Sequence, residues 1–101
     1  MDNWKIEQIN KKFRIFRRGQ IILDLCGAPG GWSQIAKLAV GNKGEVILID
    51  IQRVDLAKIH SIKGDITSEK TIKTIKTYLN SLENENLKKD LKVDVVLADC
   101  S

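Results

Sequence analysis

The residues best suited to chemistry in this chain gather around a glycine-rich turn. The stretch "LDLCGAPGGWSQIA", residues 23–36, is an apolar run that meets glycines and then takes on helical spacing. This order of elements builds the ligand site of many nucleotide-binding proteins. Three carboxylates, Asp50, Asp65 and Asp99, stand near the ends of later segments. The turn could accommodate a dinucleotide, a nucleoside without phosphates, or no ligand.

The turn does not fit the templates that bind phosphates. If a G-x-G-x-x-G turn begins at Gly27, Pro29 and Trp32 occupy the positions of its second and third glycines. The chain also lacks a G-x-x-x-x-G-K-[ST] loop. What remains is room for a ligand beside Gly30, followed by an acid, Asp50, that could accept both hydroxyls of a ribose. This combination suits S-adenosylmethionine, and the alternative is that the glycines only close a tight turn.

The elements that must position these residues alternate between strands and helices. Apolar runs predict strands, and apolar residues at helical spacing predict amphipathic helices. We expect strands at 21–25, 45–50, 59–63 and 93–98, and helices at 3–13, at 32–40 with a glycine cap at Gly41, and after Thr67 or Ser68 with Ile72, Ile75, Leu79 and Leu82 on one face. The alternation implies a parallel sheet with helices on both faces.

Such a sheet binds ligands at the carboxyl ends of its strands, near the point where the strand order reverses. Asp50, Asp65 and Asp99 all lie at or just beyond predicted strand ends. We therefore expect them on the edge where a ligand binds, although scattered acids could place one or two there by chance.

Composition limits the class of protein. The 101 residues suffice for one domain, and 43% hydrophobic with 30% charged residues is typical of a soluble globular protein. No apolar segment approaches the ~20 residues of a membrane span, and the first residues do not resemble a secretory signal. We expect an intracellular protein, cytoplasmic or, in a eukaryote, nuclear or nucleolar. Its two cysteines, Cys26 and Cys100, are expected to be reduced thiols, and we expect no metal site.

The excess positive charge is confined to the N-terminal segment. Residues 1–18 hold six basic and two acidic side chains, which accounts for the whole net charge of +4. We expect this helix and lead-in to contact an RNA backbone, the alternative being a solvated helix face. A second polar segment, 83–92, is expected to be a surface loop. The oligomeric state does not follow from the sequence.

The glycine stretch resembles the first motif of the FtsJ-like ribose 2'-O-methyltransferases, which act on ribosomal RNA, transfer RNA or messenger-RNA caps. Four further stretches resemble other motifs of that family, so the likeness extends over most of the chain: "WKIEQINKKFRIFRRG", "VILIDI", "KGDITSE" and "VDVVLAD". The resemblance implies a Rossmann-like fold that uses S-adenosylmethionine. It implies a function in RNA methylation, with ribosomal RNA as the expected substrate.

The resemblance also implies roles for individual residues. Gly30 and Trp32 would line the methionine side of the cofactor site, and Asp50 would bind the ribose. Asp65 would bind the adenine amino group, and Asp99 would lie beside the transferring methyl. Bland alternatives are a core anchor at Trp32, a helix cap at Asp65 and an ordinary strand-end acid at Asp50. In the catalytic set of the family, a lysine, an aspartate, a second lysine and a glutamate, Lys5 matches the first lysine and Asp99 the aspartate.

The second lysine and the glutamate of that set would follow the fourth strand. We therefore expect one partial domain over residues 1–101, apparently truncated after the fourth strand, whose activity alone is doubtful. Alternative interpretations are a transfer-RNA or cap methyltransferase and a non-catalytic RNA-binding fragment. Another is an RNA 5-methylcytosine methyltransferase, which uses a cysteine nucleophile, but Cys100 directly follows Asp99 instead of lying three positions on. A nicotinamide-binding oxidoreductase is disfavoured by Pro29 and Trp32.

Overall fold

The sheet at the centre of the described part of the chain has four parallel strands. A computed structural model describes residues 15–28, 30–86 and 92–98. Strands β1 (Ile21–Leu25), β2 (Glu45–Asp50), β3 (His60–Lys63) and β4 (Val95–Ala98) lie in the order β3-β2-β1-β4. The chain builds outward from β1 through β2 to β3 and then returns to the other side of β1. The strand order therefore reverses between β1 and β4.

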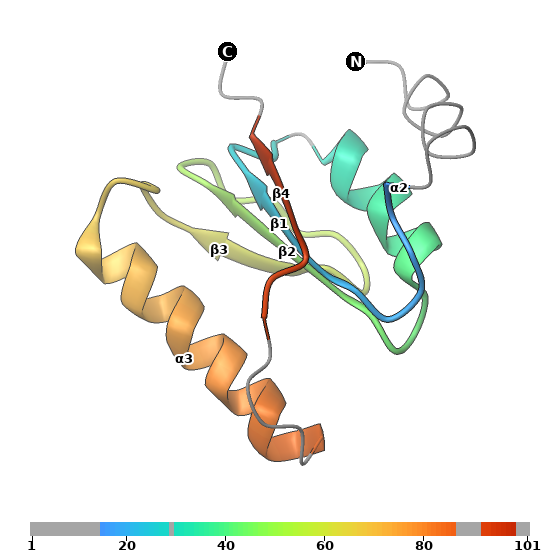
Figure 1. Cartoon of the computed structure of the whole chain (residues 1–101). Coiled ribbons are helices and arrows are strands. Elements are labelled where there is room, and N and C mark those ends of the chain that lie inside the picture. Colours follow the sequence, from blue (N-terminus) through green and yellow to red (C-terminus); the bar gives the residue numbers. More distant parts are fainter. Residues whose placement is uncertain (1–14, 29, 87–91, 99–101) are drawn as a thin grey trace.

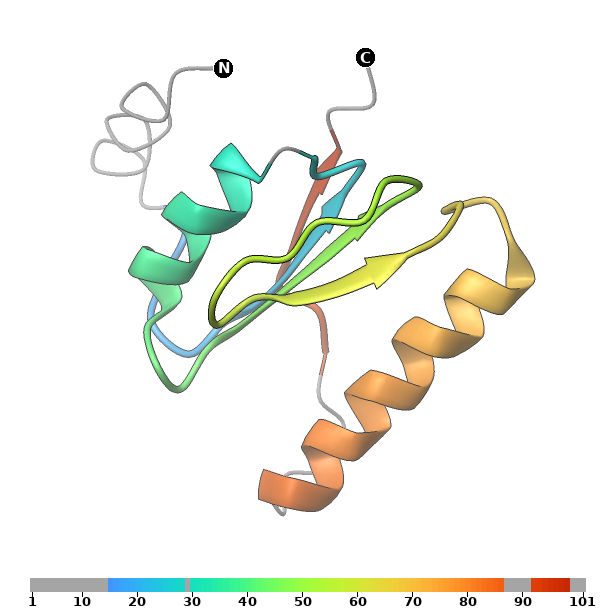
Figure 2. The ribbon, with the colours of Figure 1, turned by 180° about the vertical axis from the view of Figure 1, so that it is seen from behind.

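Two helices cover opposite faces of this sheet, as Figures 1 and 2 show from front and back. Helix α2 (Gly31–Val40) follows β1, and helix α3 (Glu69–Asn86) follows β3. Central strands that are covered on both faces should be apolar along their whole length. In β2 the four residues between the terminal acids are all buried.

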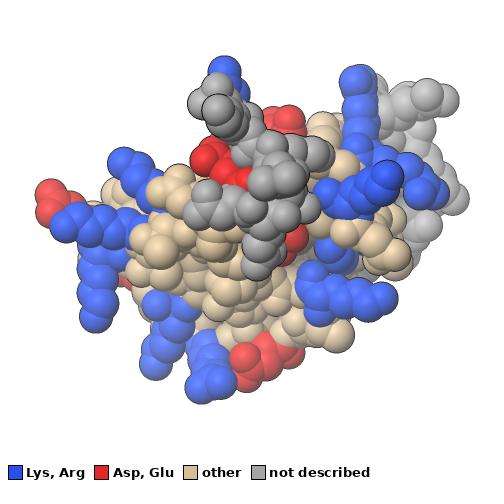
Figure 3. Space-filling view, turned by 90° about the horizontal axis from the view of Figure 1, so that it is seen from below, with Lys and Arg blue, Asp and Glu red and all other residues tan. Residues whose placement is uncertain are grey.

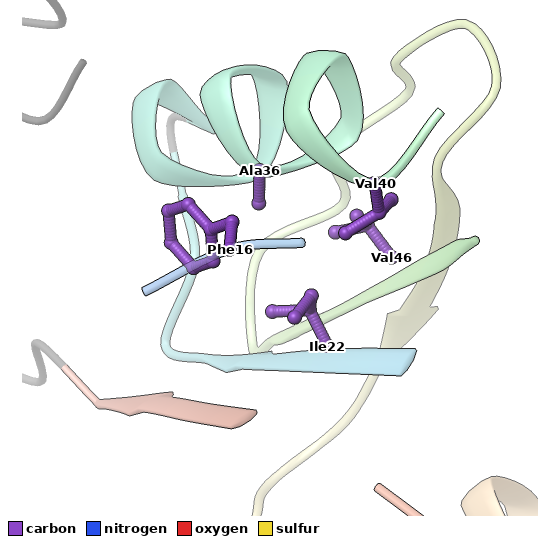
Figure 4. Packing of buried hydrophobic residues seen from close by; sticks show 5 residues of the cluster. All are labelled: Phe16, Ile22, Ala36, Val40 and Val46. Atoms are coloured by element: carbon purple, nitrogen blue, oxygen red, sulfur yellow. The ribbon is translucent and has the colours of Figure 1, made fainter. Parts of the chain in front are cut away.

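Each face of the sheet has its own apolar core. Under α2, five buried side chains pack together, as Figure 4 shows: Phe16, Ile22, Ala36, Val40 and Val46. Under α3, buried Ile47, Ile49 and Ile62 of the sheet form a second group, and partly buried Ile75 and Leu79 of the helix pack against it. Burying a side chain of this size stabilises the fold by about 1.5–3 kcal/mol. These two cores hold the strand ends at fixed positions.

The carboxyl ends of β1, β2 and β4 are level with one another. Leu25 pairs with Ile49 on one side and with Ala98 on the other. On the far side of β2, Asp50 pairs with Lys63 at the end of β3. Loops that leave these strands therefore meet at one edge of the sheet, at the point where the strand order reverses.

Most sequence-based boundaries are confirmed among the described residues. Strands β1 and β2 have the expected bounds, β3 begins one residue later and β4 two residues later than expected. Gly41 ends α2 with φ 72°, and its N–H donates to the Lys37 carbonyl. The predicted helix at 3–13 lies outside the described residues.

Two expectations need correction. Helix α3 continues to Asn86, so residues 83–86 are helical and not part of a loop at 83–92. Buried Leu82 anchors this end of the helix, and the glutamates beyond it favour helix. Residues 87–91 lie outside the described part. Cys26 is disulfide-bonded, so the expectation of a reduced thiol there is wrong.

Within the described part of the chain, none of the helices has the length and apolar character that crossing a membrane requires.

Candidate functional site

The glycine-rich turn is fastened to the end of β2. The backbone N–H of Gly27 donates to the Ile49 carbonyl at 3.2 Å. The next residue, Ala28, donates its N–H to the Asp50 carboxylate oxygen Oδ2 at 3.0 Å. The turn after the first strand and the acid after the second, 22 residues apart in sequence, are therefore parts of one site.

The carboxylate of Asp50 keeps acceptor capacity after these bonds. Its other oxygen, Oδ1, accepts from the Gln52 N–H at 2.8 Å. A carboxylate has about four lone-pair positions, so roughly two remain after the two backbone bonds. Asp50 is half-buried, so its orientation is fixed while part of it faces solvent. The side chain is placed to accept two further hydroxyl groups.

Gly30 is the N-cap of helix α2, and its backbone conformation is one that residues with a side chain rarely adopt. Its φ is 106°, and its carbonyl accepts the Gln34 N–H at 3.0 Å. A Cβ at this position would lie 2.3 Å from Cδ1 of Leu56, in the loop after β2. The left-handed backbone therefore calls for glycine here, and a Cβ would also displace the end of the Leu56 side chain. The expected role of Gly30 in lining the cofactor site stays a prediction.

Asp24 and Ser33 form a buried pair that sequence reasoning missed. Asp24 lies inside β1 with only 2% of its surface exposed, and Ser33 in α2 is fully buried. The Ser33 hydroxyl donates to Oδ2 of Asp24 at 2.7 Å. The signal was present in the sequence, because an aspartate within an apolar strand needs a polar partner. The pair fixes the first turn of α2 against the end of β1.

Trp32 packs at the start of α2 as a partial core anchor. Its indole is partly buried against the apolar core under α2. The indole N–H is buried and has no hydrogen-bond partner among the described residues. The anchor interpretation is confirmed, and the cofactor role of Trp32 stays a prediction.

Asp65 is oriented by its own loop. Its Oδ1 accepts both the hydroxyl and the backbone N–H of Thr67, at 2.7 and 2.8 Å. These two bonds lower the pKa of the exposed Asp65 carboxyl, the hydroxyl bond most strongly. The preceding residue, Gly64, donates its N–H to the Asp50 carbonyl at 2.8 Å. Asp65 is therefore an ionised acceptor held beside the end of β2.

The two expected catalytic residues, Lys5 and Asp99, lie outside the described residues, and so does Cys100. Ala98, directly before Asp99, ends β4 and pairs with Leu25. The described part of the site therefore consists of the turn, Asp50 and Asp65, together with the supporting pair under α2.

The donors and acceptors of this edge fit the adenosine part of S-adenosylmethionine. Asp50 has acceptor positions for ribose hydroxyls, and Asp65 supplies an ionised acceptor for an exocyclic amino group. The described residues of the turn bring no lysine or arginine that would neutralise a pyrophosphate.

A parallel sheet covered by helices on both faces, with a glycine turn and an acid at the reversal of strand order, is a doubly wound α/β domain, an architecture found in many nucleotide-binding proteins. The family model of the FtsJ-like methyltransferases matches residues 3–101. The chain belongs to this family.

Individual relatives agree with this assignment. The chain is 41% identical to "Ribosomal RNA large subunit methyltransferase E" of Methanocaldococcus jannaschii, over 98% of this chain and 39% of that protein. It is 39% identical to the protein of the same name from Methanothrix thermoacetophila, over 97% of this chain and 34% of that protein. A crystal structure described as a ribosomal RNA methyltransferase of Plasmodium falciparum matches with a TM-score of 0.72 and 26% identity, over 96% of this chain and 53% of that one. The chain spans about two fifths or less of these curated relatives.

Proposed function

We propose that this chain binds S-adenosylmethionine at the carboxyl edge of its sheet and takes part in methyl transfer to a ribose 2'-hydroxyl of ribosomal RNA. One observation carries the proposal: the Asp50 carboxylate accepts the Ala28 N–H, which joins the glycine turn and the ribose-type acid into one site. The similarity to proteins named as ribosomal RNA methyltransferases supports the substrate class.

In this proposal the two described aspartates of the site have binding roles. Asp50 accepts the two hydroxyls of the cofactor ribose, and Asp65 accepts from the adenine amino group. The bound cofactor supplies a methyl group activated by its positive sulfonium. The protein mainly contributes alignment, because an in-line displacement at an activated methyl depends on how the reactants are held.

Removal of the hydroxyl proton needs a base, because a ribose hydroxyl is a weak acid. By resemblance, Lys5 and Asp99 belong to the set of residues around the transferring methyl. The basic N-terminal segment would hold the RNA by its phosphates. These roles are assigned by motif alone.

Calorimetric titration with S-adenosylmethionine tests the proposal. We expect saturable binding, and we expect Asp50→Ala to weaken it by about 1–3 kcal/mol through lost charge-assisted hydrogen bonds, a factor of roughly 5 to 150. The matched control is Asp55→Ala, since Asp55 lies on the same loop, is exposed and pairs only with Arg53 among the described residues.

Asp55→Ala should bind as tightly as the unmodified chain. Asp50→Asn, which keeps an acceptor, and a thermal melt of each variant separate loss of binding from loss of fold. The proposal fails if the folded chain binds no S-adenosylmethionine, or if both aspartate variants bind it equally well.

A further inference from the structure

A second polar pocket lies at the opposite edge of the sheet, where β2 and β3 begin. It has a volume of about 450 Å³. Six of its lining residues carry polar or charged side chains: Lys37, Asn42, Glu45, Lys58, His60 and Tyr78. Glu45 is the first residue of β2 and Asp50 the last, so about 16 Å of strand separates this pocket from the candidate cofactor site. None of its residues has a role in the proposed cofactor binding.

An aromatic pair from two elements borders this pocket. The imidazole of His60, on β3, stacks on the ring of Tyr78, on α3, with ring centroids 3.6 Å apart and planes 6° from parallel. The Tyr78 hydroxyl donates to Oε1 of Glu45. This bond fixes the tyrosine ring and engages the one carboxylate of the lining. The pocket therefore offers flat π surface that is already oriented.

Two lysines line the same pocket as this aromatic pair, Lys37 and Lys58. The ammonium group of Lys37 donates to the Gly44 carbonyl at 2.9 Å, which holds it at the end of α2. Lys58 is exposed and sits in a left-handed conformation, φ 65°, that residues with long side chains rarely adopt. A neighbouring pocket shares Asn42 and adds Arg18 and Lys43. The described residues that line the two pockets include four cationic side chains and one acidic side chain.

The wider surface agrees with this charge balance. Figure 3 views the molecule from below, the side on which the strands begin, and Lys and Arg side chains project around much of its margin. Cations next to accessible aromatic surface are the combination with which proteins hold single-stranded nucleic acids, because lysines contact phosphates and any base can stack on a ring. His60 and Tyr78 are half-buried, so part of each residue still faces solvent. An acidic peptide would use the cations alone and would leave the ring pair unexplained.

We propose that the pocket formed by Lys58, His60 and Tyr78 binds an unpaired nucleotide of RNA, with its phosphate at the lysines and its base against the aromatic pair. The inference rests on the proposed function for the class of substrate. It adds a second contact on the edge opposite the cofactor site, so that a substrate RNA would be held at two places. Base-paired RNA would bind less well, because its bases are stacked within the helix.

Proton NMR tests this directly, because His60 is the sole histidine and Tyr78 the sole tyrosine of the chain. Titration with a short single-stranded oligoadenylate should move the ring resonances of both residues upfield, as a stacked base does. Inorganic polyphosphate of matched charge should leave the rings nearly unmoved. Equal ring shifts with polyphosphate would overturn the base contact.

Two variants complete the test, with RNA binding followed by fluorescence anisotropy. Lys58→Gly removes the ammonium group while allowing the left-handed backbone, and it should weaken binding and reduce the salt slope by about one. Lys76→Ala, an exposed lysine of α3 outside both pockets, should change neither. Equal losses in the two variants, or RNA binding without movement of the ring resonances, would overturn the proposal. Calorimetry with S-adenosylmethionine on the same samples reports separately on the cofactor site.

Discussion

At the scale of single residues, the buried carboxylate of Asp24 is what joins β1 to the start of α2. It accepts the hydroxyl of the fully buried Ser33 at 2.7 Å. Ser33→Ala would remove one donor from a buried carboxyl group, so we expect the free energy of unfolding to fall by about 1–3 kcal/mol in urea denaturation. Ser81→Ala is the control, since Ser81 is exposed on α3, and it should change stability by less than about 0.5 kcal/mol. Equal losses of stability in Ser33→Ala and Ser81→Ala would contradict a structural role for the hydrogen bond between Ser33 and Asp24.

A second prediction at this scale concerns the protonation of His60. Burial lowers the pKa of His60 below its usual 6.5, and the nearby Glu45 partly opposes this. The folded protein therefore binds fewer protons at His60 than the unfolded chain does. The stability that depends on neutral His60 is fully present above the pKa that His60 has in the unfolded chain. It is lost as the pH falls through the pKa of His60 in the folded protein.

NMR titration of the single imidazole should give a midpoint below 6.5, and Glu45→Gln should lower the pKa of His60 further. A midpoint above 6.5 would contradict the burial of the ring, and an increase in Glu45→Gln would contradict the placement of the carboxylate.

At the scale of elements, Gly30 couples the glycine turn to the loop after β2. Gly30→Ala meets both a left-handed backbone and a contact of 2.3 Å with Leu56. Urea denaturation should show a loss of roughly 1–2 kcal/mol from the backbone term, with a further loss from the displaced Leu56 side chain. In a Leu56→Ala background the same Gly30→Ala substitution should cost less stability. An equal cost in both backgrounds would refute the packing role.

The sequence predicted elements wherever one local pattern decided the structure. Continuous apolar runs fixed β1 and β2, and a glycine cap marked the end of α2 at Gly41. Local pattern failed at 83–86, where a charged stretch continues a helix that tertiary packing at Leu82 anchors. The sequence pattern did identify Asp50 as a candidate site residue, because this aspartate ends a predicted strand. It could not find the pocket at His60 and Tyr78, whose rings meet only after α3 packs on the sheet.

At the scale of the whole molecule, the sheet separates two polar edges with different chemistry. The carboxyl edge brings acids and a glycine turn together at the reversal of strand order. The amino edge brings lysines to an aromatic pair. Strand β4 is an outer strand of the described sheet, and its Val96 is 55% exposed. We propose the cofactor site at the first edge, where the Asp50 carboxylate closes the glycine turn.

A crystal structure of this chain with S-adenosylhomocysteine would test the placement of the cofactor at Asp50. We expect both ribose hydroxyls to lie about 3 Å or less from the Asp50 carboxylate oxygens, beside the turn that begins at Gly27. A nucleoside bound at any other place on the sheet, with Asp50 bonded only to Ala28 and Gln52, would contradict it.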